Sequence, residues 1–130
     1  MYQFRKATPA DLSLLNAWQQ TPHVRCWWDD PFEASDLDDP RVRPWIVATQ
    51  GRPFAYMQDY AVHGWADHPF AHLPPRARGI DQFIGAPEML GQGHGPGFIA
   101  TRLQALRTEA VPVVATDPHP DNTRAIKAYR

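Results

Sequence analysis

A glycine-rich segment between a strand pattern and a helix pattern is the feature that most constrains this fold. Residues 79–85 read as an apolar strand, and glycines then alternate at Gly91, Gly93 and Gly95. Glycine has no side chain to hold a ligand away from the backbone, so such a turn lets N–H groups approach a phosphorylated molecule. Behind it, apolar residues recur at i, i+4, i+7 and i+11, which predicts one apolar helix face: Ile99, Leu103, Leu106 and Ala110.

The remaining patterns predict one mixed α/β domain. A chain of 130 residues is long enough to bury about two thirds of its unfolded surface. Thr8, Pro9 and Asp11 read as a helix start, with Thr8 as the N-cap. The other expected elements are a strand near residues 2–6, a short helix within 23–28, a hairpin of strands 45–49 and 54–60, strands at 79–84 and 112–116, and a last helix from about residue 122.

Composition excludes several classes of protein. A formal net charge of −1 gives no electrostatic support for binding nucleic acid. No run approaches the roughly 20 apolar residues of a membrane span, so no membrane partner is expected. The single cysteine, Cys26, cannot form an internal disulfide, which fits a cytoplasmic protein; we expect it to be a small buried side chain. His63, His68 and His72 lack a firm element to aim them, so no metal site is expected.

The order of these patterns resembles the GNAT acyltransferase superfamily, and within it the aminoglycoside 6′-N-acetyltransferases. The matching pieces are Ile80-Asp81-Gln82, residues 90–95, Thr116-Asp117-Pro118, residues 122–129, and the early residues 23–28. The resemblance runs from about residue 2 to the last residue. It implies a GNAT-like mixed, mostly antiparallel sheet flanked by helices. Strands 79–84 and 113–116 would start as parallel neighbours and splay apart around the pantetheine arm of the coenzyme.

One departure from the family concerns the end of the chain. Family members continue past the residue that matches Tyr129 with two further strands, whereas this chain stops at Arg130. We therefore expect a single GNAT-like domain over residues 1–130 that lacks the usual C-terminal strands. Because an exposed sheet edge is usually covered or paired, we also expect a homodimer through that edge.

The resemblance implies an N-acetyltransferase that moves an acetyl group from acetyl-coenzyme A to a primary amine. The 6′-amine of an aminoglycoside, and hence antibiotic resistance, is the first expectation. One alternative is acylation of a siderophore precursor or another small amine. A second is a catalytically silent module that binds acyl-coenzyme A.

Asp81 and Tyr129 are the catalytic candidates that the resemblance implies. Asp81 would orient or deprotonate the substrate amine, although a strand-edge carboxylate facing water is the alternative. Tyr129 would protonate the leaving thiolate, although an aromatic side chain packing the last helix is the alternative.

Two further sets of binding residues are expected. Backbone groups and one asparagine would hold the coenzyme: Phe83, Ile84, Gly91, Gln92, Gly93, His94, Gly95 and Asn122. Leu90 stands where the family often has a basic residue or glutamine, so one phosphate contact is expected to be absent.

The acceptor amine would meet Trp27, Trp28, Asp81 and Asp117. We expect only one of the two tryptophans to face the cleft, and Asp117 reads equally well as a residue that starts a turn. The acidic residues within 29–39 would either attract a polycation or form a solvated face.

Overall fold

The described part of the protein is built around a single sheet. The structure, a computed structural model, describes residues 2–26, 28, 30–61, 77–90, 92–109, 111, 114 and 115. Within these ranges the strands are β1 (Tyr2–Lys6), β2 (Val42–Thr49), β3 (Arg52–Ala61), β4 (Arg78–Ile84) and β5 (Val114–Ala115). They follow one another across the sheet in chain order, antiparallel except for the parallel pair β4–β5. The predicted mostly antiparallel α/β sheet is confirmed.

The β2–β3 hairpin and the β4–β5 pair set the shape of this sheet. Gln50 and Gly51 both have positive φ, of 52° and 75°, as a two-residue hairpin turn requires. At the other side, Arg78 pairs with Val114 and Gly79 with Ala115. The predicted splay of these two strands involves chain beyond residue 115, outside the described ranges.

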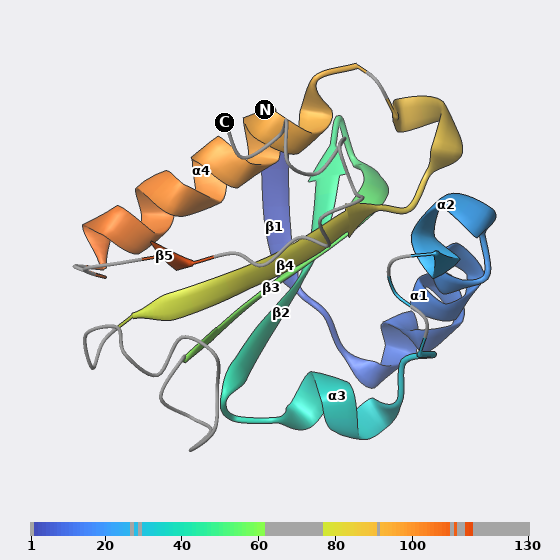
Figure 1. The fold of residues 1–130 in the computed structure, drawn as a ribbon, viewed down its shortest axis with the longest axis horizontal. Coiled ribbons are helices and arrows are strands. Elements are labelled where there is room, and N and C mark those ends of the chain that lie inside the picture. Colours follow the sequence, from blue (N-terminus) through green and yellow to red (C-terminus); the bar gives the residue numbers. More distant parts are fainter. Residues whose placement is uncertain are drawn as a thin grey trace.

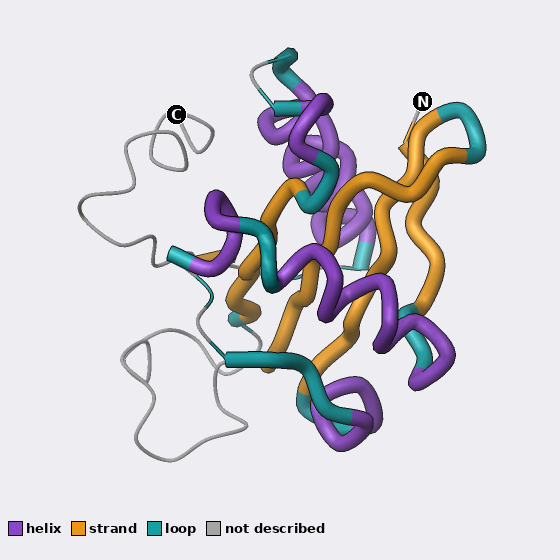
Figure 2. The backbone as a smooth tube through the Cα atoms, turned by 90° about the vertical axis from the view of Figure 1, so that its right-hand side faces the viewer, coloured by secondary structure: helices purple, strands orange, loops and turns teal. Residues whose placement is uncertain are grey.

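Helices cover both faces of the sheet (Figures 1 and 2). In the described ranges they are α1 (Leu12–Gln19), α2 (Pro22–Arg25), α3 (Ala34–Asp38) and α4 (His94–Thr108), with single 3-10 turns at Pro9–Asp11 and Pro87–Met89. None of these helices is long and apolar enough to cross a membrane. Helix α4 packs on one face through Phe98, Ile99 and Leu106. On the other face, Leu15 and Trp18 of α1 and Leu37 of α3 pack against Ile46 and Tyr56.

The two helix starts near the acidic residues depend on capping by aspartate. The predicted start at Thr8 is confirmed: its N–H donates to Asp11 Oδ2 over 2.9 Å, and Arg5 pairs with the same carboxylate. Helix α3 was not expected within the acidic run. Its first turn is closed by the Glu33 N–H, which donates to Asp36 Oδ2 over 2.8 Å. Short-range capping therefore makes helical a segment that reads as charged loop.

Two burial predictions are wrong. The sequence predicts Leu103 on the buried face of α4, but Leu103 is 38% exposed, whereas Arg102 beside it is buried. An apolar periodicity marks only apolar side chains as inward-facing, whereas Arg102 faces inward because the buried carboxylate of Asp59 neutralises its charge. Cys26 is exposed, since Val24 is the residue of α2 that packs into the core.

Candidate functional site

The described candidates fall into two places, one around Asp81 on the α1–α3 face and one at the start of α4. Trp28, Asp81 and Phe83 belong to the first place, and Gln92, Gly93, His94 and Gly95 to the second, with Ile84 at the end of β4 between them. The expected roles of Trp27, Gly91, Asp117, Asn122 and Tyr129 concern residues outside the part of the chain that the structure describes.

Asp81 is held by a cross-strand partner. It lies opposite Gln58 in the β3–β4 register, and Gln58 Nε2 donates to Asp81 Oδ2 over 3.1 Å. Two residues back on β3, the Tyr56 hydroxyl donates to Gln58 Oε1 over 2.8 Å. Three polar side chains from two neighbouring strands therefore form a continuous chain of hydrogen bonds that ends at the candidate carboxylate.

The tyrosine at the start of this chain is fully buried. Burial raises the pKa of the Tyr56 hydroxyl well above its usual range, and the carboxylates of Asp36 and Asp81 raise it further. A hydroxyl in that setting stays protonated, so it can donate to the Gln58 amide oxygen.

Three aromatic rings, those of Trp28, Phe32 and Phe83, surround Tyr56 on the face of the sheet that carries Asp81. Trp28 stacks on Phe32 with centroids 5.4 Å apart and planes 16° from parallel, and it meets Phe83 edge-on at 5.2 Å. Its carbonyl accepts a 2.9 Å hydrogen bond from Gln19 Nε2 on α1. One face of the Trp28 indole is thus covered by Phe32, so a sugar ring could stack only on the other.

The last peptide group of β4 is held on both sides. The Gly85 N–H points toward β3 and donates to the Phe54 carbonyl over 2.8 Å. By the two-residue alternation, the backbone groups of Phe83 point toward β3 and those of Ile84 point away from it. The Ile84 carbonyl instead accepts a 2.8 Å hydrogen bond from His23 Nε2 on α2.

The start of α4 has the geometry that a bound phosphate needs. Gly93 is the N-cap with φ of 80°, and the first bond of the ladder runs from the Gly97 N–H to its carbonyl over 3.3 Å. Pro96 has no N–H, so Gly93, His94 and Gly95 supply the donors that precede the ladder. A helix of 15 residues also places partial positive charge there. The backbone present therefore fits a pyrophosphate.

The side chains of this loop are engaged elsewhere. Gln92 Nε2 donates to the Glu88 carbonyl over 2.6 Å, and His94 Nδ1 lies 3.0 Å from the Tyr2 hydroxyl. Tyr2 in turn lies so close to Gly97 that a Cβ there would overlap its ring. The predicted residues at this end are thus brought together through their backbone, with the side chains used to fix the loop.

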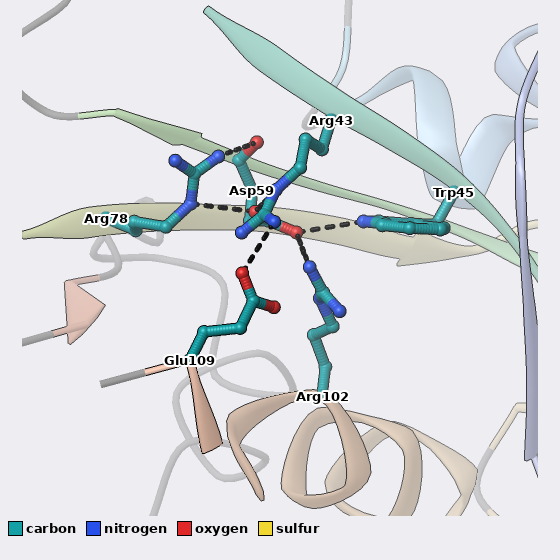
Figure 3. A network of polar contacts seen from close by, with 6 residues as sticks. All are labelled: Arg43, Trp45, Asp59, Arg78, Arg102 and Glu109. Atoms are coloured by element: carbon teal, nitrogen blue, oxygen red, sulfur yellow. Dashed lines mark hydrogen bonds and ion pairs between the residues drawn. The ribbon is translucent and has the colours of Figure 1, made fainter. Parts of the chain in front are cut away.

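The sequence did not reveal an ion cluster around Asp59 on the α4 face. We call it the Asp59 cluster; it comprises Arg43, Trp45, Asp59, Arg78, Arg102 and Glu109 (Figure 3). Asp59 is completely buried, and its carboxylate lies 2.7–2.9 Å from donors on Arg43, Trp45, Arg78 and Arg102. Glu109 pairs with Arg43 at the outer side.

Electrostatics explain how a buried carboxylate persists in this cluster. Burial by itself would raise the pKa of Asp59, but the Trp45 indole N–H and the surrounding guanidiniums outweigh it and bring that pKa below its ordinary value. Arg102 also stacks over the Trp45 ring, 4.6 Å from its centroid. A signal was present in the sequence, because Arg102 and Asp59 each interrupt an otherwise apolar periodic pattern. Neither pattern alone could show that the two side chains meet.

Comparisons with known proteins agree on one family. The acetyltransferase (GNAT) domain family matches residues 7–130. Aminoglycoside N(6′)-acetyltransferase type 1 of Klebsiella pneumoniae is 30% identical over 139 residues, covering 96% of this chain and 69% of that protein. The crystal structure of aminoglycoside acetyltransferase AAC(6′)-Ib in complex with coenzyme A gives a TM-score of 0.86 at 29% identity, covering 99% of this chain and 81% of that chain. Its complex with coenzyme A and kanamycin gives the same values.

Proposed function

The chain belongs to the GNAT acetyltransferase family, and from that premise we propose that it acetylates an amine of an aminoglycoside with acetyl-coenzyme A. The family assignment confirms the resemblance read from the sequence. The choice of acceptor is supported by relatives named as aminoglycoside acetyltransferases and by a similar structure that holds kanamycin. The observation that carries the proposal in this chain is Asp81, which is oriented on β4 beside an aromatic wall and near the strand end that leads to the glycine loop.

In this proposal the coenzyme lies along the outward side of the β4 end and reaches the start of α4. Acetyl-coenzyme A supplies an acetyl group activated as a thioester. The N–H groups of Gly93, His94 and Gly95 would bind its pyrophosphate. The Ile84 carbonyl is taken by His23, so the Ile84 N–H, which also points away from β3, would meet the pantetheine arm. Phe83, expected from the sequence to contact the coenzyme, would contribute its ring to the acceptor side.

Asp81 would hold the substrate ammonium and accept its proton. An amine must be neutral to attack, and a carboxylate with an ordinary pKa of about 3.9 is ionised at neutral pH and ready to bind the cation. The amine nitrogen then bonds to the acetyl carbon as the bond to sulfur breaks. Tyr129 remains the predicted proton donor to the departing thiolate. Asp117 and one of the two tryptophans remain predicted contacts of the acceptor, and Asn122 remains a predicted contact of the coenzyme.

The test is thiol release from acetyl-coenzyme A with kanamycin as acceptor. We expect aminoglycoside-dependent turnover by the unaltered protein and a loss of about 100-fold or more in kcat/KM for Asp81→Asn. Glu109→Gln, an exposed carboxylate at the end of α4 on the other face of the sheet, is the matched control and should keep full activity. Coenzyme binding, measured by calorimetry, should be alike in all three proteins.

Three other outcomes would change this assignment. Turnover with a siderophore precursor or another small amine, but not with aminoglycosides, would change the proposed acceptor and leave the proposed reaction unchanged. Coenzyme binding without turnover on a broad amine panel would indicate a silent acyl-coenzyme A-binding module. Failure to bind the coenzyme would overturn the proposal altogether.

A further inference from the structure

We propose that Tyr56 and Gln58 are positioning residues that fix the candidate base, as a one-way hydrogen-bond chain from Tyr56 through Gln58 to Asp81. The inference rests on the proposed function only in taking Asp81 as the group that meets the amine. The three side chains lie on one face of two paired strands, with contacts of 2.8 and 3.1 Å.

The direction of the chain follows from the chemistry of its two ends. An ionised carboxylate only accepts hydrogen bonds, so the Gln58 amide must turn its N–H toward Asp81. Its oxygen is then left facing Tyr56, whose hydroxyl donates. A flipped amide would set its carbonyl against the carboxylate, two acceptors in contact. The carboxylate thus sets the orientation of the amide, and the Tyr56 hydroxyl holds it there by donating to the amide oxygen.

Burial makes this arrangement rigid. Tyr56 is fully buried, with its ring packed edge-on against Phe32 at 5.0 Å and Trp28 at 5.7 Å. Its hydroxyl therefore cannot turn to solvent, and a protonated donor without a partner would be costly there. The rings of Trp28 and Phe32 therefore do more than line the acceptor side, because they hold Tyr56, the first residue of the hydrogen-bond chain that orients Asp81.

The charges near this chain are negative among the described residues. Asp36 on α3 and Asp81 on β4 both act on the Tyr56 hydroxyl, and His23 on α2 is the titratable side chain bound at the end of β4. Neighbouring carboxylates favour protonation of one another, whereas a donated N–H favours the ionised form. Gln58 would therefore keep Asp81 ionised as well as oriented.

Three variants test the chain. Gln58→Met removes the donor to Asp81 at similar length. Tyr56→Phe removes the hydroxyl that holds the amide oxygen, and the double variant removes both. For Gln58→Met we expect the acid limb of the pH dependence of kcat/KM to move up by about half a unit to one unit. We also expect kcat to fall about tenfold, with KM for acetyl-coenzyme A unchanged.

The double variant distinguishes positioning from independent effects. If Tyr56 acts through Gln58, the double variant should match Gln58→Met alone, since residues in one hydrogen-bond network are not additive. Tyr60→Phe, which removes a hydroxyl from the same face of β3, is the control and should leave the pH profile unchanged. Effects of Tyr56→Phe and Gln58→Met that add in full, or a wild-type pH profile in both, would overturn the inference.

A second readout separates this inference from the proposed function. Carbon-13 NMR titration of the Asp81 carboxyl needs no turnover. We expect its pKa to be higher in Gln58→Met and in Tyr56→Phe than in the wild type, and unchanged in Tyr60→Phe. If the protein fails to acetylate aminoglycosides but these pKa shifts appear, the hydrogen-bond chain is supported and the proposed acceptor is wrong. If turnover is seen without the pKa shifts, the proposed role of the hydrogen-bond chain is wrong.

Discussion

Arg102 on α4 and Asp59 on β3 form an ion pair in which both side chains are almost fully buried. The Arg102 Nε lies 2.9 Å from Asp59 Oδ2, and the side chains are 8% and 0% exposed. The pair connects the helix that follows the glycine loop to the middle of the sheet. Because charges taken from water must be compensated, the position of α4 depends on this one carboxylate.

Removal of that carboxylate should destabilise the protein strongly. In Asp59→Ala the guanidiniums of Arg78 and Arg102 lose their buried partner, and we expect the free energy of unfolding to fall by about 3–5 kcal/mol. Urea denaturation at pH 7 measures it. Glu109→Ala, at the exposed side of the same cluster, should cost far less, and equal losses in the two variants would contradict a central role of Asp59.

The same carboxylate predicts how stability depends on pH. The pKa of Asp59 is lower in the folded protein than its ordinary value of about 3.9, so the folded state binds this proton less readily than the unfolded state. Its contribution is complete above about pH 4–5 and is lost as the pH falls through the folded pKa. The stability difference between wild type and Asp59→Asn should therefore shrink on acidification. A constant difference between pH 7 and pH 3 would refute this.

Packing at the end of β4 leaves no room for a side chain at Gly85. A Cβ there would overlap Cδ2 and Cγ of Trp18 on α1. We expect Gly85→Ala to cost about 1–3 kcal/mol, as overpacking does in well-filled cores. If this clash is the cause, adding Trp18→Leu should cost less in the Gly85→Ala background than in the wild type. Thermal unfolding of the four proteins of the cycle measures that coupling.

Alanine substitutions at two glycines with positive φ distinguish the effect of backbone strain from an effect on coenzyme binding. Gly93 and Gly51 have φ of 80° and 75°, and a Cβ would meet nothing within 4 Å at either position. Alanine at each should therefore lower stability by a similar amount, about 1–2 kcal/mol. Only Gly93→Ala, at the N-cap of α4, should also raise the Kd for coenzyme A in calorimetry. Equal Kd values for coenzyme A in the two variants would show that Gly93 is not part of the coenzyme-binding site.

The sequence predicted the elements whose signals are local. Thr8 and Pro9 mark a helix start, Gly51 marks a hairpin turn, and the structure has both. The sequence does not predict α3, because its N-cap Glu33 and the Asp36 that accepts from the Glu33 N–H stand among other acids, where composition suggests a solvated loop. The prediction of the inward face of α4 is wrong because Arg102 can be buried only when Asp59, more than 40 residues away in sequence, neutralises its charge.

The residues of the candidate site also fall into those that local sequence signals predict and those that they do not. Asp81 and the glycines can be proposed as site residues from motif and spacing, since their chemistry is carried by residue type. The parts played by Tyr56 and Gln58 could not, because Gln58 meets Asp81 only through the register of β3 on β4. A one-residue slip of that register would send Gln58 to the opposite face.

The peptide group that joins Ile84 to Gly85 has its oxygen bound by His23 and its nitrogen bound to Phe54. A strand end with both atoms committed cannot rotate to suit what arrives there. Any molecule that docks along it meets a surface already in its final shape, so little conformational entropy remains to be lost on association. Preorganisation of this kind favours slow dissociation, and here it depends on one histidine from a helix of only four residues.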